Sequence, residues 1–128
     1  MNPTGTALVF STYLGGTLDD SVTALALDGS GNVYVAGATL SSDFPMLNAY
    51  QSKYGGAASD NNQPVIKTGD GFVAKFDTTG KLVYSTYLGG SADDAIMSLA
   101  VDSTGAAFVT GFTSSANFPG RSAPPAGR

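Results

Sequence analysis

A nine-residue segment occurs twice in this chain and constrains its fold more than any other feature. Residues 8–16 read Leu-Val-Phe-Ser-Thr-Tyr-Leu-Gly-Gly, and residues 82–90 repeat them with Tyr in place of Phe. The match continues at the same offset beyond the two glycines, as far as a Phe-Pro pair at residues 44–45 and again at 118–119. Self-similarity at a long fixed offset indicates repeated structural units. The sequence therefore predicts architecture more directly than activity.

Composition restricts the chemistry that the chain can carry. Only 6 of the 128 residues are Lys or Arg and the formal net charge is −4, so no basic stripe for nucleic acid exists. Cys and His are both absent, which excludes disulfides, thiolate chemistry and the commonest general base. No run of 18 apolar residues predicts a membrane-spanning helix, and residues 1–5 do not resemble a signal peptide. The 17 glycines instead favour short strands joined by tight turns.

Short apolar segments separated by turn residues predict an all-β fold. Residues 28–32 and 102–106 read as turns that begin with Asp, and we expect positive φ angles at Gly31 and Gly105. Residues 48–54 are compatible with a short helix. The expected strands cover residues 7–14, 22–27, 33–39, 71–76, 81–88, 96–101 and 107–112.

The expected strands are apolar or small on both faces. In residues 22–27, alternation places Val22 with Ala24 on one face. It places Leu25 with Leu27 on the other. An ordinary half-exposed hairpin would alternate apolar with charged residues, so this pattern indicates sheets that are covered on both sides. Each blade of a β-propeller is covered in this way by its two neighbours.

Several motifs stand in a fixed order along the chain, and the earlier ones return in the second copy. They are Ser-Thr-Tyr-Leu-Gly-Gly at residues 11–16, Asp-Asp at 19–20, the turn and strand at 28–39, Asp-Phe-Pro at 43–45, Ala-Tyr-Gln at 49–51, Tyr-Gly-Gly at 54–56 and Asp-Gly-Phe-Val-Ala-Lys-Phe-Asp at 70–77. Together they resemble the bacterial SBBP repeat, named for a seven-bladed β-propeller, over residues 7–119. The resemblance implies four-stranded blades in large secreted or cell-surface bacterial proteins. It implies no agreed enzymatic activity and no catalytic residues.

We therefore expect antiparallel four-stranded meander blades of β-propeller type, with one complete blade and parts of two flanking blades. Closed propellers need roughly four to eight blades, so the expected partners are other blades of the same propeller or copies of the same chain. An insertion at residues 57–69 is expected to be mobile and dispensable. The expected parts are residues 1–16 as the outer strand of a preceding blade, 17–90 as a complete blade with an insertion at 57–69, 91–119 as the first half of a second blade, and 120–128 as a disordered tail.

Residues 8–14 and 107–112 would each lack a neighbouring strand, which leaves backbone donors and acceptors unpaired. We expect the two segments to pair with each other, as ring-closing strands do in propellers, giving a four-stranded sheet stacked on a three-stranded one. The alternative is that residues 8–14 stay free or pair with another molecule. The residues buried by the closure would include Leu25, Val35, Leu99 and Val109.

The pairs Asp19-Asp20 and Asp93-Asp94 are the most suggestive polar residues. Paired carboxylates after a glycine turn could ligate calcium or perform acid–base catalysis. They also stand where the chain crosses between strands, and Asp side chains cap backbone N–H groups at such places. We therefore interpret them as caps. Catalysis is disfavoured because no His or Cys accompanies them, and calcium binding is left open.

The other polar motifs are also interpreted as structural. Residues 28–32 faintly resemble a calcium loop but offer a single carboxylate, so a hairpin turn is favoured. The glycine pairs at 15–16 and 89–90 lack the helix and the Lys-Thr of a phosphate loop. Ser11 and Ser85 lack an activating base. Four tyrosines could form a sugar-stacking surface, although packing between blades is favoured: Tyr13, Tyr34, Tyr84 and Tyr87.

These observations predict a non-catalytic β-propeller repeat module that acts as a scaffold or binding surface in a bacterial extracellular or cell-surface protein. That localisation rests on the resemblance alone. No catalytic, cofactor-binding or metal residue is assigned, a protein or carbohydrate ligand is left open, and no nucleic acid or membrane insertion is expected. Two alternatives remain. One is a lectin-like short-chain propeller assembled by oligomerisation, and the other is a carbohydrate-active or metal-dependent enzyme that uses the paired Asp residues.

Overall fold

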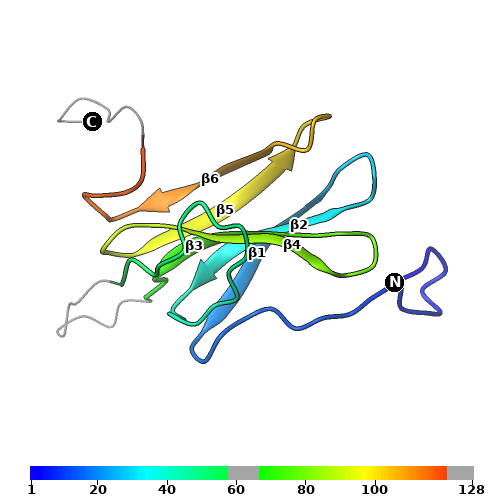
Figure 1. The fold of residues 1–128 in the computed structure, drawn as a ribbon, viewed down its shortest axis with the longest axis horizontal. Helices are drawn as coiled ribbons and strands as arrows, with labels where there is room; N and C mark the ends of the chain where they lie inside the picture. Colours follow the sequence, from blue (N-terminus) through cyan, green and yellow to red (C-terminus); the bar gives the residue numbers. More distant parts are fainter. Residues whose placement is uncertain (58–66, 121–128) are drawn as a thin grey trace.

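The computed structural model describes residues 1–57 and 67–120, whose fold consists of six antiparallel strands in two stacked sheets with their connecting loops (Figure 1). Sheet A has the strand order β1-β2-β3-β4, and sheet B consists of β5 and β6. The expected all-β fold of propeller-type blades is confirmed, and the two sheets do not close into a ring. The strands are β1 (Asp20–Leu27), β2 (Val33–Thr39), β3 (Asp70–Phe76), β4 (Leu82–Leu88), β5 (Asp94–Val101) and β6 (Ala107–Thr113).

Asp side chains shape the hairpin turns. Between β1 and β2, Asp28 Oδ1 accepts hydrogen bonds from the Ser30 N–H at 2.9 Å and the Asn32 N–H at 3.0 Å. Gly31 in this turn has a φ of 84°, a left-handed conformation that costs a residue with a Cβ roughly 1–2 kcal/mol. The turn between β5 and β6 has the same φ at Gly105. The predicted positive φ at both glycines is confirmed.

Sheet A has two different faces. We call the face that carries Val35 and Phe72 the front face, and the face that carries Ala36 and Val73 the back face. The loop after β2 covers part of the front face, and the ring centroid of its Phe44 lies 4.5 Å from that of Phe72. The front-face core consists of Val35, Phe44, Phe72, Ala74, Phe76 and Tyr87.

Strand β1 contains a bulge between Val22 and Ala24. A bulge inserts one extra residue and so changes which side chains share a face. Val22 therefore lies on the front face with Leu25 and Leu27, and the prediction that placed it beside Ala24 is wrong. Strand β5 carries the same irregularity at the corresponding place in the second copy, so the bulge belongs to the repeat.

Sheet B stacks on the back face of sheet A (Figure 1). Strand β5 lies against β1, β2 and β3, and its Ile96 is buried between the sheets. Leu99 and Val109 pack against the same cluster. All three residues have front-face counterparts in the first copy of the repeat. The front of sheet B therefore packs on the back of sheet A, as successive blades of a propeller do.

Residues 8–14 form no strand, and within the described ranges β6 pairs with β5 alone. The predicted ladder between residues 8–14 and 107–112 is therefore wrong, and sheet B has two strands rather than three. The physical reason is placement, because Phe10 and Leu14 pack against the front-face core of sheet A while sheet B covers its back. Leu25, which the closure would have buried, is 63% exposed.

The loop between β2 and β3 follows the outer edge of sheet A. Leu47 forms a β-bridge with Ser85 of β4, and the Tyr87 N–H donates to the Gln51 carbonyl at 3.1 Å. The short helix considered for residues 48–54 does not form, because backbone groups of this loop pair with β4 instead. No helix in the described part of the chain is long and apolar enough to cross a membrane.

The predicted insertion at residues 57–69 is only partly visible. Residues 58–66 lie outside the described residues, as do residues 121–128 of the predicted tail. At the end of the insertion, the N–H groups of Thr68 and Gly69 both donate to Asp93 Oδ1 at 3.1 Å, and Gly69 is buried. The last residues of the insertion are therefore held against sheet B, and the dispensability of the insertion stays a prediction.

Replacing Gly31 by Ala should lower the free energy of unfolding by about 1 kcal/mol or more, because its φ is strained for any residue with a Cβ. Gly29 of the same turn is a matched control, since a Cβ there would meet no atom within 4 Å and its φ is not positive. Gly29→Ala should stay within about 0.5 kcal/mol of the wild type. Urea denaturation followed by circular dichroism measures both, and equal effects would contradict the turn assignment.

Candidate functional site

The same polar cap closes the entry to both sheets. Before β1, Asp20 Oδ2 accepts a hydrogen bond from the Gly16 N–H at 2.8 Å. Before β5, Asp94 Oδ2 accepts one from the Gly90 N–H at the same distance. In each case the carboxylate of the first strand residue binds the turn that precedes the strand. The cap therefore fixes the direction in which the chain enters a sheet.

A second polar group ties each cap to the loop that follows the next hairpin, after β2 in the first copy and after β6 in the second. Asp43 Oδ1 accepts from the Thr17 N–H at 2.9 Å, and Asn117 Oδ1 accepts from the Ser91 N–H at 2.9 Å. The exchange of Asp for Asn between the repeats is tolerated because a carboxylate oxygen and an amide oxygen are equivalent acceptors for one N–H group. Turn, strand and loop of each repeat are thereby held together.

The repeated glycine pairs have a steric role at these caps. A Cβ on Gly16 would lie 2.4 Å from the Cβ of Ser41, and a Cβ on Gly90 would lie 2.5 Å from the Cβ of Ser115. Both distances are shorter than side chains tolerate. Glycine is therefore required because the turn passes directly over the serine of the loop, which agrees with the rejection of a phosphate loop.

The two Asp pairs differ in their surroundings. The Asp93 side chain is buried and accepts two backbone N–H groups, whereas Asp19 is exposed. The carbonyls of both residues are used alike, since that of Asp19 accepts from the Leu40 N–H at 2.9 Å and that of Asp93 from the Ser114 N–H at 2.8 Å. The hydrogen bonds of Asp20, Asp93 and Asp94 are those expected of capping side chains. Within residues 1–57 and 67–120, no three acidic side chains are grouped as a metal site would require. Calcium binding by either pair stays an untested alternative.

Sequence reasoning missed Asp70, the first residue of β3, which is fully buried. Its carboxylate accepts hydrogen bonds from the N–H groups of Gly55 at 2.7 Å and Gly56 at 3.2 Å. The side-chain amide of Gln51 donates a third at 3.1 Å. A carboxylate directly before an apolar strand is the sequence signal that could have indicated this site.

The surroundings of Asp70 change its acidity. Burial raises the pKa of Asp70 to about 6, the backbone hydrogen bonds oppose the rise, and the charge of Asp94 adds to it. Gly89 lies between the two carboxylates, because a Cβ there would be 2.8 Å from both Asp70 Oδ1 and Asp94 Oδ2. Burial together with the nearby carboxylates also raises the pKa of Tyr54 to about 12. The junction between the sheets therefore holds two neighbouring buried acids.

Asp28, the carboxylate of the suspected calcium loop, is used within its own turn. Besides two backbone N–H groups, it accepts from the Asn32 side chain at 2.8 Å and the Tyr34 hydroxyl at 3.1 Å. These hydrogen bonds, led by that from the Asn32 side chain, lower the pKa of Asp28 to about 2. The geometry is that of a hairpin turn.

The four tyrosines do not share one surface. Tyr34 and Tyr84 lie on the back face with ring centroids 6.4 Å apart, and the Tyr34 hydroxyl reaches the Gly105 carbonyl of sheet B at 3.2 Å. Tyr87 is buried on the front face, and Tyr13 is fully exposed. Packing between blades, the favoured interpretation, is confirmed for Tyr34.

The hydroxyl groups near the sheets are structural. Thr23 Oγ1 donates to the carbonyl of Ile96 and so links the back of sheet A to sheet B. Ser85 is buried, and its hydroxyl has no hydrogen-bond partner among the described residues. Ser11 is exposed beside the front face. Neither serine is arranged as an activated nucleophile.

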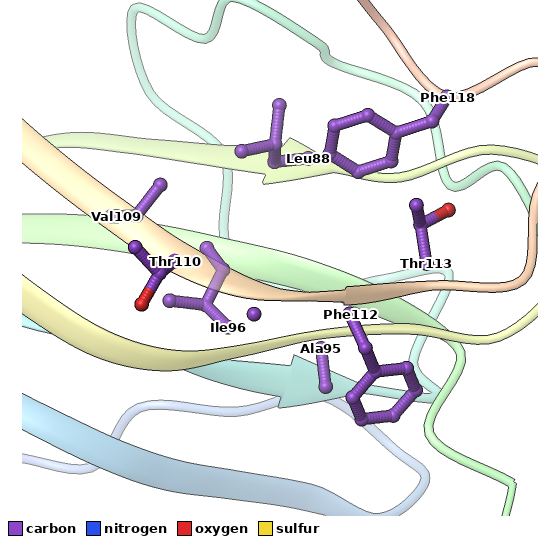
Figure 2. A pocket seen from close by; sticks show the side chains of 9 residues that line it. Leu88, Ala95, Ile96, Val109, Thr110, Phe112, Thr113 and Phe118 are labelled. Carbon is purple, nitrogen blue, oxygen red and sulfur yellow. The ribbon is translucent and has the colours of Figure 1, made fainter. Parts of the chain in front are cut away.

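An apolar pocket of about 200 Å³ lies beside the open edge of β6 (Figure 2). Leu88, Ile96, Val109 and Phe118 are among the residues that line it, and Figure 2 shows Phe118 beside Leu88. In sheet A the counterpart of Phe118 is Phe44, which is 3% exposed because β3 and β4 lie against it, whereas Phe118 is 37% exposed. The pocket marks the position that outer strands occupy in sheet A.

The chain thus contains a four-stranded sheet, a capped turn that leads to the next sheet, and a second sheet stacked on the first. These features together define a propeller-type repeat. The beta-propeller repeat SBBP matches the chain twice, over residues 9–45 and 83–119. These two segments make up more than half of the chain, which belongs to the SBBP beta-propeller repeat family. Each match begins before a cap and ends at the following Phe-Pro pair, so it contains all the hydrogen bonds of the cap itself. Comparisons with curated proteins and with solved structures gave no match.

Asp70 should make the protein less stable as the pH rises from about 4 to 6. Its folded-state pKa of about 6 lies above the ordinary 3.8, so in this interval the folded protein binds the proton more tightly than the unfolded chain. The stabilisation is complete below about pH 4 and lost above about pH 6. Asp70→Asn should remove this decline in stability. The midpoint of thermal unfolding, measured between about pH 3.5 and 7, checks this expectation.

The matched control is Asp102→Asn. Hydrogen bonds lower the pKa of Asp102, so its contribution is present at neutral pH and fades only below about pH 4. This variant should keep the decline between about pH 4 and 6. If Asp70→Asn loses stability over this pH range as the wild type does, Asp70 is not the source of the decline.

Tyr87→Phe should lower the free energy of unfolding by about 1–3 kcal/mol. The buried Tyr87 hydroxyl donates to the Ser41 carbonyl at 2.7 Å and accepts from the Phe44 N–H at 3.2 Å, and both partners would lose it. Tyr13 occupies the same repeat position and is exposed, so Tyr13→Phe should change stability by less than about 0.5 kcal/mol. Chemical denaturation compares the two, and similar losses would argue against this role for the buried hydroxyl.

Proposed function

We propose that this chain is a non-catalytic β-propeller repeat module that serves as a scaffold, with its sheet faces acting as surfaces on which neighbouring blades stack. The observation that carries the proposal is the junction between the sheets. The front of sheet B packs on the back of sheet A, and the cap at its entry repeats the cap of sheet A, residue for residue at Gly and Asp. A unit whose two ends repeat in this way is suited to extension by further units.

The use of the acidic residues supports a scaffold over an enzyme. Acid–base catalysis needs carboxyl oxygens within reach of a substrate proton. In this chain Asp20 and Asp94 bind the turns before their strands, and Asp93 binds the N–H groups of residues 68 and 69. Their hydrogen bonds hold the backbone at the junction, which is a structural task.

The setting is part of the same proposal. Resemblance to a bacterial repeat supports placing the module in an extracellular or cell-surface protein. In such a protein the blade would present loops to a protein or carbohydrate ligand, while the stacked sheets provide rigidity. The specific observation behind the scaffold role remains the junction, and no ligand is assigned.

Extension of the repeat tests the proposal. Appending a further copy of residues 46–119 after residue 119 continues the repeat in phase and supplies the strands that sheet B lacks. Each added copy should raise the midpoint of thermal unfolding, by about 2–4 °C for each kcal/mol gained. A scrambled segment of equal composition is the control. An unchanged midpoint, or a separate transition for the added copy, would count against a stacking module.

A further inference from the structure

Two apolar sheet faces are left uncovered by residues 1–57 and 67–120. The front face of sheet A exposes Leu25 and Leu27 beside a groove of about 660 Å³. The back face of sheet B exposes Met97 and Phe108, the latter 61% accessible to solvent. Exposed apolar surface on a sheet face is a candidate interaction site.

The two faces are the halves of an interface that the chain already contains. Inside the chain, Ile96, Leu99 and Val109 on the front of sheet B pack on the back of sheet A. We propose that a second copy of this chain docks in the same way, with the front of its sheet A on the back of sheet B. This inference rests on the proposed stacking function and names its partner. In the docking molecule, the front-face residues of sheet A that would repeat the contact are Val22, Leu25 and Val35.

The residues that differ between the two back faces fit a contact between separate molecules. On sheet A, hydroxyl groups of Thr23 and Tyr34 donate to carbonyls of sheet B. Their counterparts on sheet B are Met97 and Phe108, which carry no hydroxyl group. The second contact therefore depends on burial of apolar surface, which is non-directional and drives most protein association.

The same docking brings residues 8–14 of the second copy toward the open side of sheet B. Phe10 and Leu14 pack against the front-face core of sheet A, and their counterparts Tyr84 and Leu88 pack against the cluster between the sheets, which includes Ile96 of sheet B. Residues 8–14 therefore lie against the front of sheet A in the way that β4, their repeat counterpart, lies against sheet B. In the assembly they lie on the side of β6 where the pocket of Figure 2 opens.

The contact joins two different faces, so it is heterologous and does not close after two copies. Each dimer keeps one free front face and one free back face. Further copies add at either end, and a ring forms if the rotation between copies closes. An isologous dimer, in which like faces meet, would instead stop at two copies.

Mixing of one-sided variants tests this arrangement. Leu25→Glu blocks the front face and Phe108→Glu blocks the back face, both at exposed positions. The wild type should gain mass with concentration, as measured by light scattering after gel filtration up to about 1 mM, the Kd that corresponds to about 4 kcal/mol of binding. Each variant alone should remain at the 12.9 kDa of one chain. Their mixture should form a dimer of twice that mass and nothing larger.

Controls separate the possible outcomes. Leu27→Glu and Met97→Glu repeat the test if a first variant loses its circular dichroism spectrum, and Tyr50→Glu, exposed on a loop, should associate like the wild type. A wild type that stays at 12.9 kDa overturns the inference but leaves stabilisation by appended repeats intact. Association that neither blocking variant abolishes, or a mixture that stays monomeric, overturns the head-to-tail contact. Failure of appended repeats to stabilise would instead overturn the stacking function itself.

Discussion

The hydrogen bond from a glycine N–H to the first carboxylate of the next sheet is the constraint on which the rest of this structure depends. It occurs between Gly16 and Asp20 and again between Gly90 and Asp94. The chain must turn sharply where it leaves one blade and enters another, and backbone groups there have no ladder partner. The Asp carboxylate supplies that partner. Glycine allows the approach, and the second sheet then lies against the back of the first.

Burying two carboxyl groups at the junction is electrostatically unfavourable. Asp70 and Asp94 are buried on the two sides of Gly89, and burial of the former raises its pKa to about 6. The carboxylate accepts hydrogen bonds from N–H groups of the Tyr-Gly-Gly segment, which would lose this acceptor if an apolar residue replaced it. The loop that crosses the edge of sheet A is thereby fixed to the junction, which links the long β2–β3 connection to the stacking of the sheets.

The sequence predicted what is local and missed what depends on distant partners. Six strands and the turns at Gly31 and Gly105 follow from apolar patterning and turn chemistry, which act within a few residues. The bulge after Val22 shifts a face without any residue type that marks it. The burial of Asp70 depends on Gly55 and Gly56, about fifteen residues away, and so leaves only a faint signal in the sequence. Residues 8–14 have the composition of a strand but need a neighbour to become one.

In a repeat protein, an apolar strand indicates that the fold places a neighbouring sheet on it. It does not indicate that the strand is buried within this one chain. Leu25 has the pattern of a core residue and is exposed, whereas its counterpart Leu99 is partly buried because sheet A covers it. The same reasoning separates the two back faces. That of sheet A carries hydroxyl groups matched to carbonyls of the sheet it already holds, and that of sheet B carries Met97 and Phe108. Hydrogen bonds contribute to the first junction, whereas Met97 and Phe108 have no hydroxyl group, so any contact on the second face would depend on burial of apolar area.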